Sequence, residues 1–314
     1  MSDTTAYNLA QCNPATLKTT RTTCLPEEML ERLRSAWNER FPNHKIPASI
    51  KRKETLWRAL RDRLSRQYEC ASEYCAVTHL GASSEKVEAA RYFRPKKPAA
   101  WAKKPTDWHD TLTIANVMEQ YEAAYPTFEF IGPVPIDFDA KVAGMSGMSG
   151  MSGMSGMAEN WGKCIVDELC RLDIKKMRAS GKQAIGIVFN LDPHDRPGSH
   201  WICAYIDLVK NAAYYYDSYG YEPPAEVKRL LRRCWSQGIK QIYWNDIRHQ
   251  RKETECGTYC MYVIILLLKG RPFGEICKNG VNDDTMNAVR DVLYATEKPR
   301  VAAIREATNL LMSV

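Results

Sequence analysis

The second half of the chain alternates between short apolar or aromatic runs and longer amphipathic segments. Four runs are rich in β-branched or aromatic residues and stop at turn residues, which predicts strands over Ala184–Asn190, His200–Leu208, Ala212–Asp217 and Lys240–Trp244. Helical spacing and helix boundary residues predict helices over Pro223–Gln237, Thr258–Lys269, Asp284–Glu297 and Val301–Met312. The combination predicts an α+β fold with a central antiparallel or mixed sheet flanked by helices.

The first part of the chain carries helical patterns instead. Pro26–Arg40 opens with proline and two acidic residues, which is typical of a helix start. Together with Lys51–Tyr74 it predicts a small helical unit. Thr111–Tyr125 is also helical in pattern, and Phe128–Phe138 has the composition of a strand with prolines near its end.

Composition shifts predict two domains. The Pro- and Lys-rich stretch Arg94–Pro105 is typical of a linker, so we expect a basic helical accessory domain over residues 1–98 and a larger domain over 99–314. Within the larger domain, residues 144–157 repeat Met-Ser-Gly, a composition that resists helix and strand and predicts a flexible surface insertion. Residues 284–314 are expected to form the C-terminal helices.

Apolar content excludes several classes of protein. The chain has 314 residues and enough apolar material for a sizeable core, which argues against disorder or collagen. Its longest apolar run is Met261–Leu268, far shorter than the roughly 18 residues of a membrane-spanning helix. Its first 25 residues contain no continuous apolar stretch. We therefore expect a soluble protein that does not bind membranes and is not secreted.

Positive charge is concentrated near the N-terminus. Residues 1–105 contain 20 Lys and Arg against 11 Asp and Glu, whereas residues 106–314 contain 24 against 26. In Lys51–Arg66, an apolar stripe of Leu56, Leu60 and Leu64 leaves Arg and Lys on the other side of the predicted helix. This basic face is either a solvated surface or a site for DNA or another acidic partner.

The cysteines do not form a regular framework. Their number, 11, is odd, and without a secretory signal they are expected to be mostly reduced thiols. Cys70 and Cys75 are separated by a four-residue gap and His79 is near, but no further Cys or His pair at metal-ligand spacing accompanies them. We interpret them as buried thiols in a helical segment and predict no metal and no cofactor.

Four residues could together perform nucleophilic catalysis. Cys256 lies where a polar loop meets the predicted helix Thr258–Lys269, and a helix N-terminus favours a thiolate. His200 and Asp217 lie at the paired ends of two predicted strands, so the carboxylate could orient the imidazole for Cys256. Gln250, six residues before the cysteine, could donate a hydrogen bond to an oxyanion, and Gly257 allows close backbone approach.

These residues carry a resemblance to a known family. Cysteine proteases that process ubiquitin-like (SUMO-type) modifiers have motifs in a typical order and spacing. This chain resembles them in His200-Trp201, Tyr215–Ser218, and Gln250 ahead of Glu255–Gly257. Thr106–Asp139 further resembles the viral branch of that family, which includes the polyprotein protease of African swine fever virus and the adenovirus protease. The resemblance covers residues 106–275 best. It implies a papain-like or adenain-like protease core.

The resemblance also implies roles for individual residues. Cys256 is expected to be the nucleophile, His200 the general base and acid, Asp217 the orienting carboxylate and Gln250 an oxyanion donor. Trp201 and Trp108 match tryptophans that enclose a Gly-Gly substrate tail. The segment around Trp108 reads Trp-His-Asp, which departs from the family's usual pattern.

The expected activity is therefore cysteine endopeptidase cleavage after Gly-Gly type sites, in the processing of viral structural polyproteins during virion maturation. This implies a location in the host cytoplasm, the virion or both. One alternative is an isopeptidase that removes a ubiquitin-like modifier. Two alternatives outside the proteases are an inactive protease-fold scaffold that binds DNA or capsid, and an acyltransferase that uses a thioester donor.

Overall fold

The computed structural model describes residues 8–20, 22–70, 72–141, 163–297 and 307–311. Its packing divides the chain into two compact units, residues 126–280 and residues 1–125 with 281–314. This division differs from the expected boundary after residue 98, because the segment after residue 280 packs with the N-terminal part. Lys97 N, for example, donates to Ala295 O over 2.9 Å. The two domains expected from composition stay a prediction.

A mixed sheet forms the centre of the unit 126–280. Its described strands are β1 (Phe128–Pro135), β2 (Ala184–Asn190), β3 (Trp201–Asp207), β4 (Ala212–Tyr216) and β5 (Gln241–Trp244). They lie in the order β1-β2-β3-β4-β5, with β2, β3 and β4 antiparallel and each edge strand parallel to its neighbour. The predicted α+β fold with a mixed sheet is confirmed.

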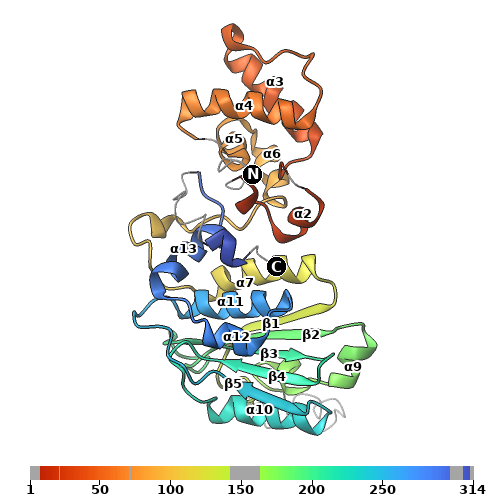
Figure 1. Ribbon diagram of the computed structural model, residues 1–314, viewed down its shortest axis with the longest axis vertical. Coiled ribbons are helices and arrows are strands. Elements are labelled where there is room, and N and C mark those ends of the chain that lie inside the picture. Colours follow the sequence, from red (N-terminus) through yellow and green to blue (C-terminus); the bar gives the residue numbers. More distant parts are fainter. Residues whose placement is uncertain (1–7, 21, 71, 142–162, 298–306, 312–314) are drawn as a thin grey trace, which may run out of the picture. The chain divides into compact units, whose positions relative to one another are not determined.

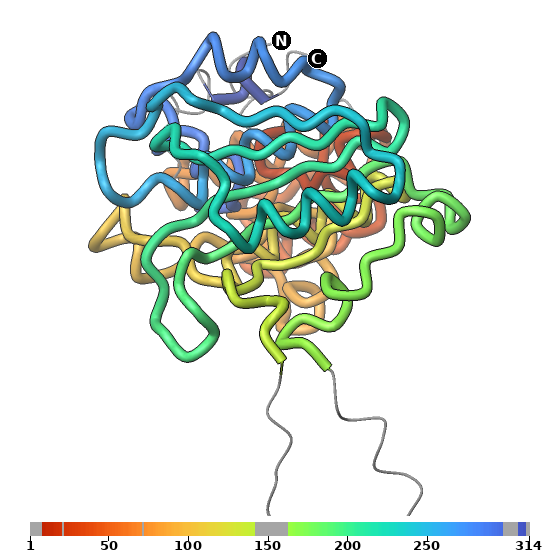
Figure 2. The backbone as a smooth tube through the Cα atoms, turned by 90° about the horizontal axis from the view of Figure 1, so that it is seen from below, coloured from red at the N-terminus to blue at the C-terminus, as the bar shows by residue number. Residues whose placement is uncertain are grey.

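Helices cover both faces of this sheet. The helices of the unit are α8 (Asp167–Cys170), α9 (Ile174–Ala179), α10 (Ala225–Ser236), α11 (Cys256–Leu268) and α12 (Phe273–Lys278). Figure 1 shows α11 and α10 on opposite faces, and Figure 2 shows α10 lying over the strands from its own side. On that side, Leu230 and Leu231 pack with Ile187 and Ile202 in one apolar cluster.

Helix α11 is apolar around its whole circumference because it is buried. Every residue from Cys256 to Leu267 is buried, so α11 is a core helix rather than an amphipathic surface helix. It packs chiefly on β3. Because strand side chains alternate between faces, Trp201, Cys203 and Tyr205 lie on the α11 side while Ile202 and Ala204 lie in the α10 cluster.

The other unit is helical. Its described helices include α2 (Pro14–Thr19), α3 (Glu27–Arg40), η1 (Pro42–His44), α4 (Lys53–Tyr68), α5 (Glu73–Leu80), α6 (Ser83–Ala90), η2 (Ala99–Ala102), α7 (Thr111–Ala124) and α13 (Asp283–Leu293). Leu56, Leu60 and Leu64 are fully buried in its main apolar cluster, as their spacing predicts. The predicted helical N-terminal part is present.

Two helices end earlier than their sequence pattern suggests. The segment Lys51–Tyr74 breaks at Glu69, which has a φ of 55° and ends α4. Helix α13 ends at Leu293 because the chain becomes extended there, and Ala295 N donates to Pro95 O over 2.8 Å. Of the helix predicted over Val301–Met312, residues 307–311 are described and are helical.

Six cysteines form disulfides, so the prediction of mostly reduced thiols is wrong in this structure. The pairs are Cys12–Cys24, Cys70–Cys75 and Cys164–Cys170. Their Cα atoms are 5.2, 6.3 and 6.3 Å apart, within the range that a disulfide requires. The fold creates this proximity, and the irregular spacing along the sequence does not reveal it.

The Met-Ser-Gly repeat lies outside the described residues, so its predicted flexibility stays a prediction. The described residues on either side of residues 142–162 lie next to each other, because Lys141 pairs with Cys164 in an antiparallel bridge (Figure 2). Among the described helices, none is both long and apolar enough to cross a membrane.

We predict that Gly220→Ala lowers the free energy of unfolding by about 1–3 kcal/mol. Gly220 has a φ of +77°, and a Cβ there would lie 2.8 Å from the backbone carbon of Ile247. Gly238→Ala is the matched control, since Gly238 also has a positive φ but has no described atom within 4 Å of an added Cβ. Denaturant unfolding of the two variants measures the clash, and an equal loss in both would contradict the prediction.

Candidate active site

Cys256 is the first residue of α11 and is almost fully buried. The chain reaches it from a polar loop, so the sulfur lies at the positive end of the helix dipole, where a thiolate is stabilised. Glu255, just before the helix, is also buried, and its carboxylate accepts hydrogen bonds from the backbone and side chain of Thr254. The nucleophile candidate is therefore held by rigid secondary structure.

His200 and Asp217 meet at the neighbouring ends of β3 and β4. His200 directly precedes β3 and Asp217 directly follows β4, and the pairing of Cys203 with Tyr216 brings these ends together. His200 Nε2 donates to Asp217 Oδ1 over 2.8 Å, and both side chains are buried. Asp217 Oδ1 also accepts from the backbone N of Tyr219 over 2.9 Å.

The same imidazole contacts Cys256. The His200 side chain forms hydrogen bonds with both Asp217 and Cys256. Because Nε2 faces Asp217, Nδ1 is the ring nitrogen left for the sulfur. Burial lowers the pKa of His200, but the hydrogen bonds to Asp217 and Cys256 and the nearby charges outweigh it and raise the pKa to about 9. At neutral pH this imidazole therefore carries a proton.

Gln250 is buried beside the turn that follows β4. Its Oε1 accepts from Ser218 Oγ over 2.6 Å, and its Nε2 donates to Lys252 O over 2.9 Å. A primary amide has two N–H groups, so one hydrogen remains for an oxyanion. That role stays a prediction, as do the catalytic roles of the other site residues.

The two tryptophans expected to bind substrate have different environments. Trp201 begins β3 and is 4% exposed, directly after His200. Trp108 belongs to the other compact unit and is 41% exposed. The expected enclosure of a Gly-Gly tail by both stays a prediction.

Sequence reasoning missed the residues that hold this constellation in place. The Tyr219 ring stacks on His200 with centroids 4.6 Å apart. Asn245, fully buried, donates to Asp217 O over 2.9 Å and to Ile247 O over 2.8 Å. Tyr219 and Ser218 lie next to the predicted Asp217, which is the signal that could have identified them; Asn245 is 28 residues away and gives no such signal.

A second histidine near this turn has a structural environment. His249 Nδ1 is 2.8 Å from the Tyr216 hydroxyl, and its Nε2 is 2.9 Å from Cys277 O. Burial lowers the pKa of His249. With both ring nitrogens engaged, it is poorly suited to proton transfer.

Comparisons with known proteins agree with this geometry. Residues 176–298 match the Ulp1 protease family, C-terminal catalytic domain. The chain is 27% identical to a protein of Acanthamoeba polyphaga mimivirus named as a thiol protease, over 91% of this chain and 93% of that one. It is 30% identical to a cysteine protease of African swine fever virus (isolate Tick/Malawi/Lil 20-1/1983), over 35% of this chain and 43% of that protein.

The fold has a solved counterpart as well. A crystal structure of an African swine fever virus protease matches 91% of this chain and 96% of its own, with a TM-score of 0.60 and 17% identity. The site and the relatives together define a cysteine peptidase. Residues 176–298 carry the Ulp1-type catalytic domain, and the chain is similar to proteases of large DNA viruses.

We predict that His200 titrates near pH 9 and that Asp217→Asn or Cys256→Ala moves its pKa down toward the ordinary 6.5. Because folding raises this pKa, charged His200 stabilises the fold fully below pH 6.5, and that contribution is lost as pH rises through about 9. NMR titration of the imidazole C2 proton measures the value, with His200→Gln assigning the signal. A His200 resonance that titrates near 6.5 in the unaltered protein would disprove the proposed coupling.

Proposed function

We propose that this protein is a cysteine endopeptidase that cleaves polypeptides after Gly-Gly type sites by a Cys256–His200–Asp217 mechanism. The observation that carries the proposal is the position of His200, whose imidazole is hydrogen-bonded to both Asp217 and Cys256. A nucleophile, a base and an orienting carboxylate in this relation are what acyl transfer requires.

The chemistry follows from the charge state of the pair. The protonated imidazole favours the Cys256 thiolate, which attacks the carbonyl carbon of the scissile bond. The remaining Gln250 N–H and backbone amides at the start of α11 stabilise the oxyanion. His200 then donates its proton to the leaving amine, forming a thioester. It next takes a proton from the water that hydrolyses the thioester, and the thiolate is regenerated.

Surface features near the site favour a polypeptide substrate. Tyr243, Trp244 and Ile247 are 45–48% exposed on the segment that runs from edge strand β5 toward Gln250. Exposed apolar residues grouped in this way mark contact surfaces for macromolecules. Selection of glycine would follow if Trp201 and Trp108 enclose the substrate tail, because two indoles leave no room for a Cβ.

We place the activity in the processing of viral structural polyproteins during virion maturation, in the host cytoplasm, the virion or both. The support is that the curated relatives are viral proteases. The alternative is removal of a ubiquitin-like modifier, since some relatives from African swine fever virus are named SUMO-1 cysteine proteases. An inactive scaffold fits less well, because His200, Asp217 and Cys256 lie together. An acyltransferase fits less well, because the curated relatives are named as proteases.

A peptide panel tests the function. The full-length protein and Cys256→Ala are given fluorogenic peptides ending in Gly-Gly, peptides with Gly-Gly-X, and an intact ubiquitin-like protein. We expect cleavage after Gly-Gly that falls by at least about 10⁴-fold in Cys256→Ala. A preference for short peptides supports polyprotein processing, and a preference for the folded modifier supports the isopeptidase.

The control for an inactive result is alkylation of Cys256 by iodoacetamide. Folded protein that neither cuts any peptide nor reacts at Cys256 would refute the protease proposal in favour of the scaffold. Rapid alkylation without cleavage would refute the Gly-Gly specificity while leaving a reactive thiol site.

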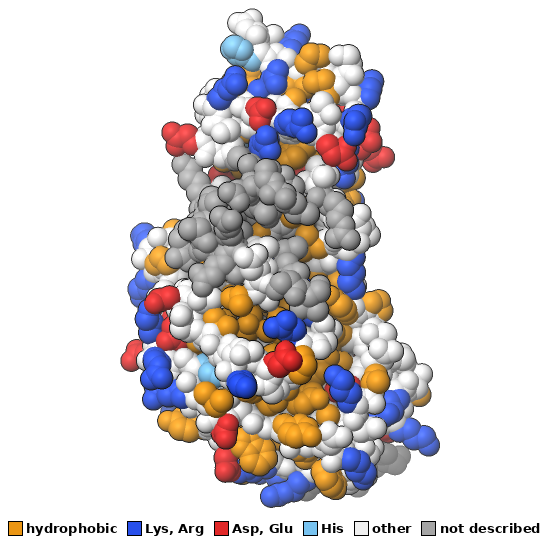
Figure 3. Space-filling view, viewed as in Figure 1, with side chains coloured by type: hydrophobic (Ala, Val, Ile, Leu, Met, Phe, Trp, Pro, Cys, Tyr) orange, Lys and Arg blue, Asp and Glu red, His pale blue; other side chains and the backbone are white. Residues whose placement is uncertain are grey.

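We further propose that the basic face of α4 binds DNA. Arg52, Arg58 and Arg66 are exposed on or next to this helix. Figure 3 shows Lys and Arg on the surface of this part of the chain. Beside α4, a hollow of about 530 Å³ is lined by the cations Lys45, Arg63 and Arg66, with one acidic residue, Asp62, in the same wall. Such a surface can neutralise phosphates and release counterions.

We predict that R52Q/R58Q/R66Q weakens binding of a DNA duplex to the full chain by at least about tenfold. Each lost phosphate contact should also reduce the slope of log binding constant against log salt concentration by about 1. K175Q/K210Q/R232Q removes the same charge from exposed positions of the other unit and is the matched control. Fluorescence anisotropy across a salt series measures both quantities. Equal weakening in the two variants, or no binding at low salt, would exclude a site on α4.

A further inference from the structure

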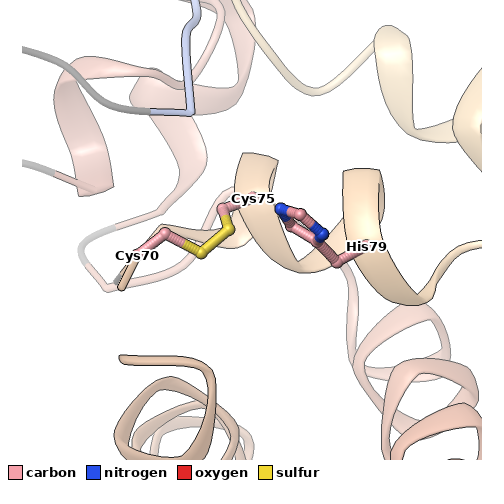
Figure 4. Close-up of side chains that lie close together, drawn as sticks. All are labelled: Cys70, Cys75 and His79. Atoms are coloured by element: carbon pink, nitrogen blue, oxygen red, sulfur yellow. A yellow bond between two sulfur atoms is a disulfide. The ribbon is translucent and has the colours of Figure 1, made fainter. Parts of the chain in front are cut away.

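A cluster of possible metal ligands lies in the helical unit, whereas His200, Asp217 and Cys256 belong to the unit 126–280. The ligand atoms of Cys70, Cys75 and His79 all lie within 4.8 Å of one another. Both cysteines are buried and His79 is half-buried. Figure 4 shows the two sulfur atoms beside the imidazole, with a ring nitrogen on the side toward Cys75.

Local structure explains why these three side chains converge. Glu69, in the left-handed region, ends α4 and turns the chain so that Cys70 lies next to the start of α5. Ser72 caps α5 by accepting from Cys75 N over 3.1 Å. Cys75 and His79 are then one helical turn apart on the same helix, so their side chains share a face.

The spacing suits a tetrahedral zinc ion. With Zn–S of about 2.3 Å and Zn–N of about 2.0–2.1 Å, ligand atoms lie roughly 3.4–3.8 Å apart around the metal. The present ligand atoms lie within 4.8 Å of one another, and the two sulfurs must separate to reach this geometry once they are no longer bonded to each other. The Cα atoms of Cys70 and Cys75 are 6.3 Å apart, which allows one ion to bind both thiolates.

A carboxylate and a stacked ring orient His79. Glu297, from the segment after α13, places Oε2 3.1 Å from His79 Nε2. Tyr68 stacks on the His79 ring with centroids 4.3 Å apart and an interplanar angle of 15°, which fixes the imidazole plane. A carboxylate that accepts a hydrogen bond from a metal-binding histidine is typical of zinc sites.

We infer that Cys70, Cys75 and His79 bind one zinc ion when the Cys70–Cys75 disulfide is reduced, with a solvent molecule as the fourth ligand and Glu297 orienting the His79 ring. A dithiol or phosphine reductant supplies two electrons, and with two protons the disulfide becomes two thiols. Zinc then displaces both thiol protons and binds the thiolates. Disulfide and zinc site are alternative states of one cysteine pair. The His79–Glu297 contact joins the site to the segment that follows α13.

Cobalt binding to the full-length chain tests this inference. Cys256→Ala is the parent, which removes the other cysteine–histidine pair that could bind metal. After reduction by a phosphine and removal of metal, Co²⁺ should give one equivalent of tetrahedral, thiolate-ligated absorption, which Zn²⁺ displaces. We expect C70S/C75S to abolish that absorption, His79→Ala to weaken binding at least about tenfold, and Glu297→Gln to weaken it roughly 10–100-fold.

Matched variants separate the site from general effects. C12S/C24S removes another cysteine pair of the same unit, and His44→Ala removes another histidine; both should bind Co²⁺ like the parent. Absence of thiolate–cobalt absorption in the reduced parent would overturn the inference. So would the same absorption in C70S/C75S.

A second measurement leaves the site residues unchanged, so it tests the zinc site even if the substituted variants fail to fold. Reduced parent protein is alkylated with and without Zn²⁺, and each cysteine is followed by mass spectrometry. Zinc should slow labelling of Cys70 and Cys75 at least about tenfold relative to Cys12 and Cys24 in the same sample. Equal labelling rates with and without zinc at Cys70 and Cys75 would refute the site.

Discussion

The buried hydrogen bond between His200 and Asp217 is the constraint on which the rest of the site depends. Asp217 is 1% exposed, and a buried carboxylate left without its partner costs about 3–5 kcal/mol. The end of the sheet must therefore supply donors, and it does so with His200 Nε2 and Tyr219 N. Because both donors come from the ends of β3 and β4, the strand register that stabilises the fold also orients the imidazole toward Cys256.

The turn that carries Asp217 also positions the approach to α11. Ser218 O accepts from Gln250 N over 2.9 Å, and Ser218 Oγ bonds the Gln250 side chain. Asn245 ties the same turn to the end of β5. A displacement of this turn would move the histidine's partner and the loop before the nucleophile together, so the geometry is kept by one shared network rather than by separate supports.

Sequence reasoning succeeded where the chemistry depends on local pattern. His200 and Asp217 could be paired in advance because antiparallel neighbours align their ends, and the start of α11 was visible as a polar loop meeting an apolar run. Sequence reasoning failed where contacts between distant segments determine the structure. The disulfide Cys12–Cys24 and the early end of α13 depend on contacts that no spacing along the chain encodes.

The environment of each thiol distinguishes Cys256 from the other free cysteines that the structure describes. Burial raises the pKa of Cys234 to about 11 and of Cys277 to about 12, so both stay neutral. Cys260, one turn after Cys256 on α11, is hydrogen-bonded to Cys203, and burial holds its pKa well above the ordinary value. Among the described cysteines, Cys256 alone combines a helix N-terminus with a protonated imidazole. The same helix thus places one thiol beside a positive charge and keeps the next one in a neutral, buried environment.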